Sequence, residues 1–167
     1  MNKFIIFLLA AVLNASVISD FLNKNYQKVC TFSQIRQNAN NPKILSIIGK
    51  ACLETDRIYL LPYIIPKLKK PSFIRKNALV FLTAVMEKRV LYSYLFDGVD
   101  LQSFCFPKID YVLSDVFWAL KNKKYQKNGD IYVIKTKDGV FKLYKKEDKM
   151  FLDEYKNGKL IKRRWYR

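Results

Sequence analysis

The spacing of apolar residues changes near residue 121, and this change constrains the fold more than any other feature of the sequence. From Asp20 to Leu120, apolar residues recur at intervals of three and four, which is typical of helices. From Asp130 onward they alternate with polar residues and are interrupted by Asp-Gly and Asn-Gly, which is typical of hairpins. The sequence therefore predicts an α+β protein with three parts: an N-terminal helical hairpin array over residues 20–120, a basic linker over 121–129, and a C-terminal four-stranded antiparallel β-meander over 130–167.

Prolines and turn residues divide the predicted helical part. The cluster 38–42 predicts a turn, and Pro42 is well placed to open the helix that follows it. Pro62 and Pro66 predict a short or kinked segment, and Gly98 predicts the end of a long helix. The expected helices cover residues 21–36, 44–53, 72–96 and 109–120.

The first residues have the pattern of a secretory signal peptide. Lys3 precedes the apolar run Phe4 to Leu13, and small residues follow it. The run is too short to span a bilayer, which needs about 20 apolar residues. We expect a signal peptide over residues 1–19 with cleavage after Ser19, cleavage after Ala15 being the second choice and an uncleaved anchor the alternative. The expected location is periplasmic or secreted.

The three cysteines must be considered in that oxidising environment. If two helices form a hairpin about the 38–42 turn, residues at equal distances from the turn face each other. The positions of Cys30 and Cys52 average to 41, so we expect a disulfide between them, worth about 3 kcal/mol on the loop-entropy model. The alternative is two buried, reduced thiols. Cys105 is then left over, either buried or paired with another chain.

The two predicted hairpins have their turns at Asp138-Gly139 and at Asn157-Gly158. A two-residue turn at the second site places Lys156 opposite Lys159 and Asp153 opposite Lys162, and the opposite charges of the latter pair favour this register. Basic residues crowd the last strand, a pattern that discourages edge pairing with other chains.

The chain carries 31 Lys and Arg against 14 Asp and Glu, a formal net charge of +17, and contains no histidine. The excess predicts contact with anionic partners: lipid head groups, lipopolysaccharide, peptidoglycan or acidic envelope proteins, with peripheral membrane contact as one form. A solvated surface that keeps the protein soluble is the alternative. Export disfavours a specific nucleic-acid partner. The residues expected to make the polyanion contact are Lys145, Lys146, Lys162, Arg163 and Arg164.

Two short stretches resemble repeat families. Residues 44–63 align with residues 76–95 at a spacing of 32, with Arg57 on Arg89, which resembles paired helices of the tetratricopeptide type over residues 44–95. Residues 154–160, with a Tyr, an Asn-Gly turn and Lys-Leu after it, resemble MORN-like hairpin repeats, and 136–141 is a looser echo. The MORN-like resemblance, extended over residues 136–166, implies an interaction or lipid-contact surface.

No catalytic, cofactor or metal constellation is predicted. A serine or cysteine nucleophile would lack its usual histidine partner, and neither a phosphate-loop pattern nor a Cys-x-x-Cys motif occurs. A carboxylate pair for peptidoglycan cleavage is the enzymatic alternative, with helix capping and solvated helix faces as the structural explanation of the same residues. We therefore expect a non-catalytic binding or scaffold protein of the cell envelope. The residues that the alternative would use are Asp97, Asp100, Asp110 and Asp115.

Overall fold

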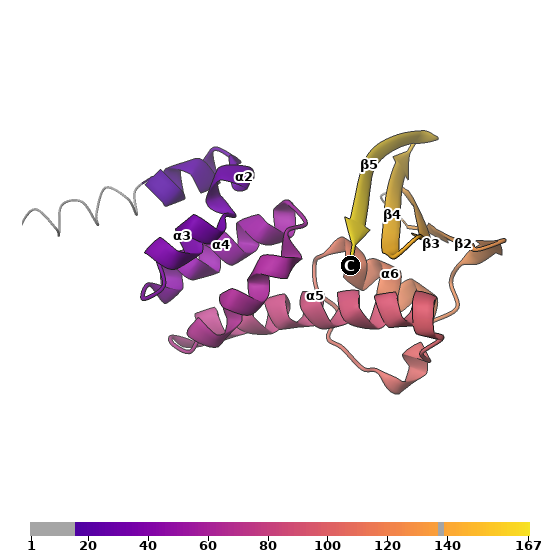
Figure 1. Cartoon of the computed structure of the whole chain (residues 1–167), viewed down its shortest axis with the longest axis horizontal. Helices are drawn as coiled ribbons and strands as arrows, with labels where there is room; N and C mark the ends of the chain where they lie inside the picture. Colours follow the sequence, from indigo (N-terminus) through magenta and orange to yellow (C-terminus); the bar gives the residue numbers. More distant parts are fainter. Residues whose placement is uncertain (1–15, 137–138) are drawn as a thin grey trace, which may run out of the picture. The chain divides into compact units, whose positions relative to one another are not determined.

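A computed structural model describes residues 16–136 and 139–167. The chain forms two compact units, one ending at Val85 and the other comprising Met86–Arg167, so the boundary falls inside a helix, α5 (Ser72–Asp97) (Figure 1). The predicted linker 121–129 lies within the second unit. The expected signal peptide falls mostly on residues 1–15, outside the described residues. Residues 16–22 are helical, and Val17 is buried.

The first unit is helical. Its elements are α2 (Tyr26–Val29), α3 (Phe32–Gln37), α4 (Pro42–Glu54), η1 (Ile58–Tyr63), η2 (Ile65–Lys67) and the first part of α5. Pro42 opens α4 as predicted, and the Asn41 side chain accepts a hydrogen bond from the N–H of Ile44 at 3.2 Å. The segment containing Pro62 and Pro66 forms two short 3-10 helices, in agreement with the expected interruption.

The expected continuous helix over 21–36 is wrong. The chain leaves the helical conformation at Cys30 and Thr31, and Thr31 then caps α3 by accepting the N–H of Gln34 at 3.2 Å. Apolar spacing continues across the break, because Val29, Phe32 and Ile35 recur at intervals of three. Apolar periodicity alone therefore did not show that the helix is interrupted.

The predicted disulfide between Cys30 and Cys52 is confirmed, with a Cα–Cα distance of 5.0 Å. The bond joins the end of α2 to α4, and both cysteines are fully buried. Such a bond is consistent with an oxidising compartment. Cys105 is exposed and forms no disulfide within the chain, so the expectation of a buried thiol is wrong, and pairing with another chain stays a prediction.

Helices α4 and α5 approach closely within the first unit. The ring of Phe81 lies where a Cβ atom on Gly49 would be, with the nearest ring carbon 2.3 Å from that position. Asn77 donates to the hydroxyl of Ser46 beside this contact. Residues 76–95, which align with 44–63 in sequence, lie within the single helix α5, whereas 44–63 cover α4 and η1. The two stretches therefore differ in structure.

The second unit contains the rest of α5, η3 (Leu101–Ser103), α6 (Val112–Lys121) and a five-stranded antiparallel sheet in the order β1-β2-β3-β4-β5. The strands are β1 (Gln126–Asn128), β2 (Ile131–Lys135), β3 (Val140–Lys146), β4 (Lys149–Lys156) and β5 (Lys159–Tyr166). The fold class is thus α+β with helices before an antiparallel sheet, as predicted, but the predicted count of four strands is wrong. The additional strand β1 lies in the expected linker, and its three exposed polar residues show no alternation that could have revealed it.

The last hairpin confirms the predicted turn and corrects the register beyond it. Asn157 and Gly158 have φ values of 51° and 76°, as a two-residue hairpin turn requires, and Lys156 lies opposite Lys159. The register then shifts between Glu154 and Tyr155, because Ile161 has no partner on β4. Asp153 consequently lies opposite Arg163, and the predicted pairing of Asp153 with Lys162 is wrong.

The preceding hairpin also differs from expectation. Its predicted turn, Asp138-Gly139, lies partly outside the described residues. Lys135 lies opposite Val140, and the N–H of Thr136 donates to the carbonyl of Gly139 at 2.9 Å, so Gly139 lies opposite Thr136, directly before β3. A Cβ atom on Gly139 would lie 2.4 Å from the carbonyl oxygen of Tyr155, and this close approach explains the glycine.

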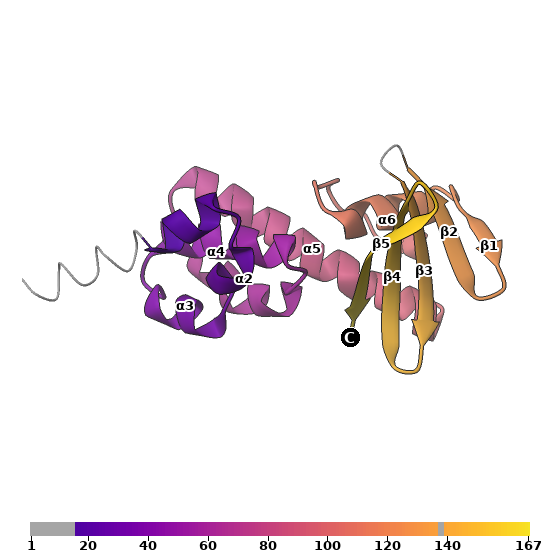
Figure 2. The same cartoon turned by 90° about the horizontal axis from the view of Figure 1, so that it is seen from above.

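One face of the sheet, the inner face, is covered by α6 and by the part of α5 that belongs to the same unit (Figure 2). Tyr94 of α5 contacts Tyr132 of β2, with ring centroids 5.5 Å apart, and the hydroxyl of Tyr92 donates to the carbonyl of Asp148 at 3.0 Å. The buried apolar residues on this face are Ile134, Phe141, Leu143, Met150, Leu152 and Tyr166. Among the described residues, no helix combines the length and the apolar character needed to cross a membrane.

Candidate binding surfaces

The opposite face of the sheet, the outer face, carries an aromatic row. Tyr144, Phe151 and Trp165 lie side by side on β3, β4 and β5, because directly opposite residues in an antiparallel sheet share a face. The rings of Tyr144 and Phe151 stack at 5.4 Å with an interplanar angle of 9°. Trp165 is 57% exposed, so the row is accessible at the β5 end.

Lysine side chains lie over aromatic rings of the same face. The Nζ atom of Lys149 is 4.9 Å from the ring centroid of Trp165, and that of Lys142 is 4.5 Å from the ring centroid of Tyr155. Each contact is a cation–π interaction that holds an ammonium group beside an apolar surface. The outer face therefore presents positive charge and aromatic area together.

An ion pair between a buried carboxylate and a half-exposed arginine supports this face. Asp153 is only 2% exposed, and its two carboxylate oxygens accept hydrogen bonds from Nε and Nη2 of Arg163 at 2.7 and 2.8 Å. The hydroxyl of Tyr144 also donates to Asp153, at 3.2 Å. Hydrogen bonding to Asp153 raises the pKa of Arg163, and burial raises the pKa of Tyr144. Within the described parts of strands β2–β5, Asp153 is the acidic residue of the outer face, and Arg163 compensates its charge.

The residues predicted to contact polyanions are divided between the two faces. Lys146 and Arg163 point to the outer face, whereas Lys145, Lys162 and Arg164 point to the inner face, because successive residues of a strand alternate. Arg164 has a side chain only 10% exposed, and its Nη1 donates to Glu154 at 2.8 Å. The Nζ atom of Lys145 lies 5.7 Å from the ring centroid of Phe96 on α5. The five residues therefore do not form one patch.

Sequence reasoning missed the lysines that accompany the aromatic row, Lys142 and Lys149. Their signal was present in the alternation of β3 and β4, where lysines share the parity of Tyr144 and Phe151. The position of Trp165 on the same face could not be read from its turn, because the bulge at Ile161 changes the parity of β5 relative to β4.

Two of the four aspartates considered for catalysis form local contacts. Asp100 accepts the N–H of Gln102 at 3.0 Å at the start of η3, and Asp115 lies 3.2 Å from the Nζ atom of Lys108. Neither Asp97 nor Asp110 forms an ion pair with a residue that the structure describes. Among the described residues there is also no cluster of three His, Cys, Asp or Glu side chains that could hold a metal ion.

The most perturbed carboxyl group belongs to a residue that the sequence did not single out, Glu87 on α5. It is fully buried and accepts a hydrogen bond from the hydroxyl of Ser114 at 2.8 Å, while its second oxygen has no partner among the described residues. Burial raises the pKa of Glu87 to about 7; the Ser114 hydrogen bond opposes this shift, and the charge of Asp115 adds to it. Because Glu87 has no access to solvent, its raised pKa concerns stability rather than contact with a substrate.

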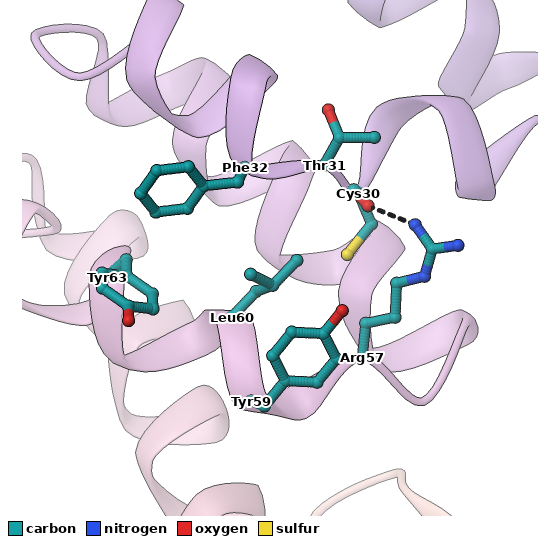
Figure 3. Close-up of a pocket in the computed structure, with 7 residues that line it drawn as sticks. All are labelled: Cys30, Thr31, Phe32, Arg57, Tyr59, Leu60 and Tyr63. Carbon is teal, nitrogen blue, oxygen red and sulfur yellow. Dashed lines mark hydrogen bonds between the residues drawn. The ribbon is translucent and has the colours of Figure 1, made fainter.

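The first unit carries a separate hollow, which we call the aromatic groove (Figure 3). It has a volume of about 540 Å³ and lies beside Cys30. The rings of Phe32 and Tyr63 meet edge to face at 5.3 Å, and Figure 3 shows the two on the same side of the groove with Tyr59 across from them. The other lining residues are Thr31, Arg57 and Leu60.

The fold and these surfaces define a class of protein: a disulfide-linked helical unit followed by a five-stranded antiparallel sheet with an aromatic, cationic outer face. No protein-family model matches the chain. No match was found among curated proteins. None was found among solved structures either. No family match therefore supports the tetratricopeptide and MORN-like resemblances.

Proposed function

We propose that this chain is an exported, non-catalytic binding protein of the cell envelope, and that the outer face of its sheet contacts the phosphate-bearing head groups of a lipid surface. The observation that carries the proposal is the placement of Lys149 over Trp165 and of Lys142 over Tyr155 on an accessible sheet face. The signal-peptide pattern and the Cys30–Cys52 disulfide support a periplasmic or secreted location.

A lipid head-group region suits this face because it is both anionic and partly apolar. Tryptophan and tyrosine favour the boundary between water and hydrocarbon, and lysine side chains extend their charge toward phosphate while their stems pack on apolar area. Exposed Leu160 on β5, which lies opposite Tyr155, adds apolar surface to the outer face. A purely polar polyanion would use the lysines but would leave this apolar surface in water.

Vesicle binding tests the proposal. The disulfide-bonded chain is sedimented at low salt with vesicles of equal parts phosphatidylglycerol and phosphatidylcholine. Replacing Lys142 and Lys149 with serine is expected to weaken binding about thirtyfold, since each lysine near an anionic surface contributes about 1 kcal/mol. Binding should also weaken steeply as salt is added.

The matched control is the double variant Lys145→Ser/Lys162→Ser, which removes the same charge from the inner face. It is expected to change binding about twofold at most. Equal losses from the two pairs would show that net charge, and not the outer face, attracts the membrane. Absence of vesicle binding by the unmodified chain would refute the proposal.

A further inference from the structure

The aromatic groove of the first unit exposes side chains that a folding chain would otherwise bury. Phe32, Tyr59 and Tyr63 are 49%, 66% and 54% exposed, although each could bury 150–250 Å² in a core or interface. Single exposed apolar residues are ordinary, but three aromatic rings around one hollow of ligand size are typical of a binding site.

The two walls of the groove are held together by covalent and polar links. Phe32 follows directly after the disulfide-bonded residue Cys30 and the cap residue Thr31, so the disulfide anchors its wall to α4. From the other wall, Nη1 of Arg57 donates to the carbonyl of Cys30 at 2.8 Å, which Figure 3 shows as the dashed line, and to that of Gln27 at 3.3 Å. A groove fixed in this way loses little conformational entropy when a ligand binds.

The lining chemistry selects for a ligand whose ring-contacting part has few polar groups that need partners. The hydroxyl of Thr31 is already engaged as the acceptor of the α3 cap, and the rest of the wall is largely aromatic or aliphatic. A sugar would bring several hydroxyl groups that need partners when buried. Proline brings an apolar ring and no N–H, and proline-containing segments in the polyproline II conformation dock into aromatic-lined grooves.

The charges around the groove select for an acidic segment. Arg57 is the charged residue that lines it, and a second hollow that shares Phe32 is lined also by Ser33, Arg36 and Gln37. The described lining residues of both hollows include no acidic side chain. A ligand that crosses Phe32 would therefore meet an arginine in each hollow.

We propose that the aromatic groove binds an extended, acidic, proline-containing peptide segment of a partner protein. The rings of Phe32, Tyr59 and Tyr63 contact the prolines, and Arg36 and Arg57 attract the carboxylates. This site lies in the first unit and does not depend on the lipid contact proposed for the second.

Fluorescence anisotropy with a fluorescein-labelled peptide of Asp-Pro-Pro repeats tests the proposal on the full, disulfide-bonded chain. The peptide is expected to bind saturably, and versions with serine for proline or lysine for aspartate are expected to bind at least about tenfold more weakly. Tyr59→Ser should weaken binding of the Asp-Pro-Pro peptide by about tenfold or more. Phe73→Ser is the matched control, because Phe73 is as exposed as Tyr63, at 54%, but does not line the groove, and it should leave binding unchanged.

Thermal unfolding of each variant separates loss of binding from loss of folding, and Tyr63→Leu provides a second test that keeps apolar area while removing the flat ring. Saturable binding that the groove variants weaken, while Phe73→Ser does not, supports the proposal. Three results would overturn it: no saturable binding of the Asp-Pro-Pro peptide, equal binding of the serine peptide, or binding of soluble peptidoglycan strands at the groove in place of the peptide.

Discussion

The two units stabilise their chain by different means. The first unit consists of short helices joined by a buried disulfide and by the close approach of Gly49 to Phe81. The second unit has strand pairing throughout its sheet and places acidic groups in buried positions, Asp153 with Arg163 and Glu87 with Ser114. The comparison teaches that the first unit should respond to redox state and side-chain volume, and the second to pH and backbone conformation.

Removing the disulfide should have the largest effect on this comparison. Cys30→Ala/Cys52→Ala frees a loop with a sequence separation of 22 and is expected to destabilise the first unit by about 3 kcal/mol. Hydrogen exchange should show loss of amide protection in α4, and much less in β3 and β4. Cys105→Ala is the control, since Cys105 is exposed and forms no disulfide. Equal loss of protection in both units would remove the distinction between them.

Adding volume at the contact between α4 and α5 should have the next largest effect on stability. Gly49→Ala places a methyl group against the ring of Phe81 and is expected to destabilise the first unit by about 2.5 kcal/mol, measured by chemical denaturation. The double variant Gly49→Ala/Phe81→Leu should recover part of the loss, because leucine leaves room for the methyl group. Lys50→Ala, at the exposed neighbouring position, should change stability by less than about 0.5 kcal/mol. A double variant as unstable as the sum of its single changes would show that the ring is not the cause.

The sequence predicted features that depend on local chemistry or on simple symmetry. The Cys30–Cys52 bond followed from the position of the turn between two helices, and it formed although the first helix is interrupted. The turn at Asn157-Gly158 followed from the need for positive φ at both residues. The helix α5 was predicted to within one residue, because Pro71 and Gly98 bracket a long apolar pattern.

The remaining features depend on long-range packing that no local pattern encodes. Strand β1 is polar and exposed, so only its pairing with β2 identifies it. The bulge at Ile161 moves Arg163 opposite Asp153 and divides the predicted basic cluster between two faces. The aromatic groove joins Phe32 to Tyr59 and Tyr63, residues far apart in sequence that fold together around the disulfide. In the same way, a continuous helical pattern could not show that α5 changes packing partners near Val85.

The response to pH should be confined to the second unit. The pKa of Glu87 is about 7 in the folded chain against 4.5 ordinarily, so folding favours the protonated form. The stabilising contribution of that form is complete below pH 4.5 and is lost as pH rises through 7. Glu87→Gln keeps a neutral side chain at every pH, and it should be more stable than the unmodified chain by at most about 3 kcal/mol at pH 8 and by almost nothing at pH 4.5.

Thermal unfolding of both proteins across this range measures the difference. Ser114→Ala sharpens the test, because the Ser114 hydroxyl stabilises the charged form, and its loss should move the transition to higher pH. Asp115→Asn should move the transition the other way, since the charge of Asp115 disfavours ionisation of Glu87. A stability difference that does not vary with pH would mean that Glu87 does not titrate in this range.

The smallest effect should come from Gly158, whose backbone conformation and surroundings both differ from those of Gly49. Gly158 has φ of 76° and an open environment, with no atom within 4 Å of an added Cβ, so Gly158→Ala should cost about 1 kcal/mol through backbone strain alone. Asn157→Gly, at the other turn position with φ of 51°, should be close to neutral by denaturation. Gly49→Ala and Gly158→Ala thus separate two causes of instability. A smaller side chain in place of Phe81 relieves the steric overlap in Gly49→Ala, whereas no side-chain change relieves the backbone strain in Gly158→Ala. If Gly158→Ala proved as costly as Gly49→Ala, the turn would have to carry packing that its open surroundings do not provide.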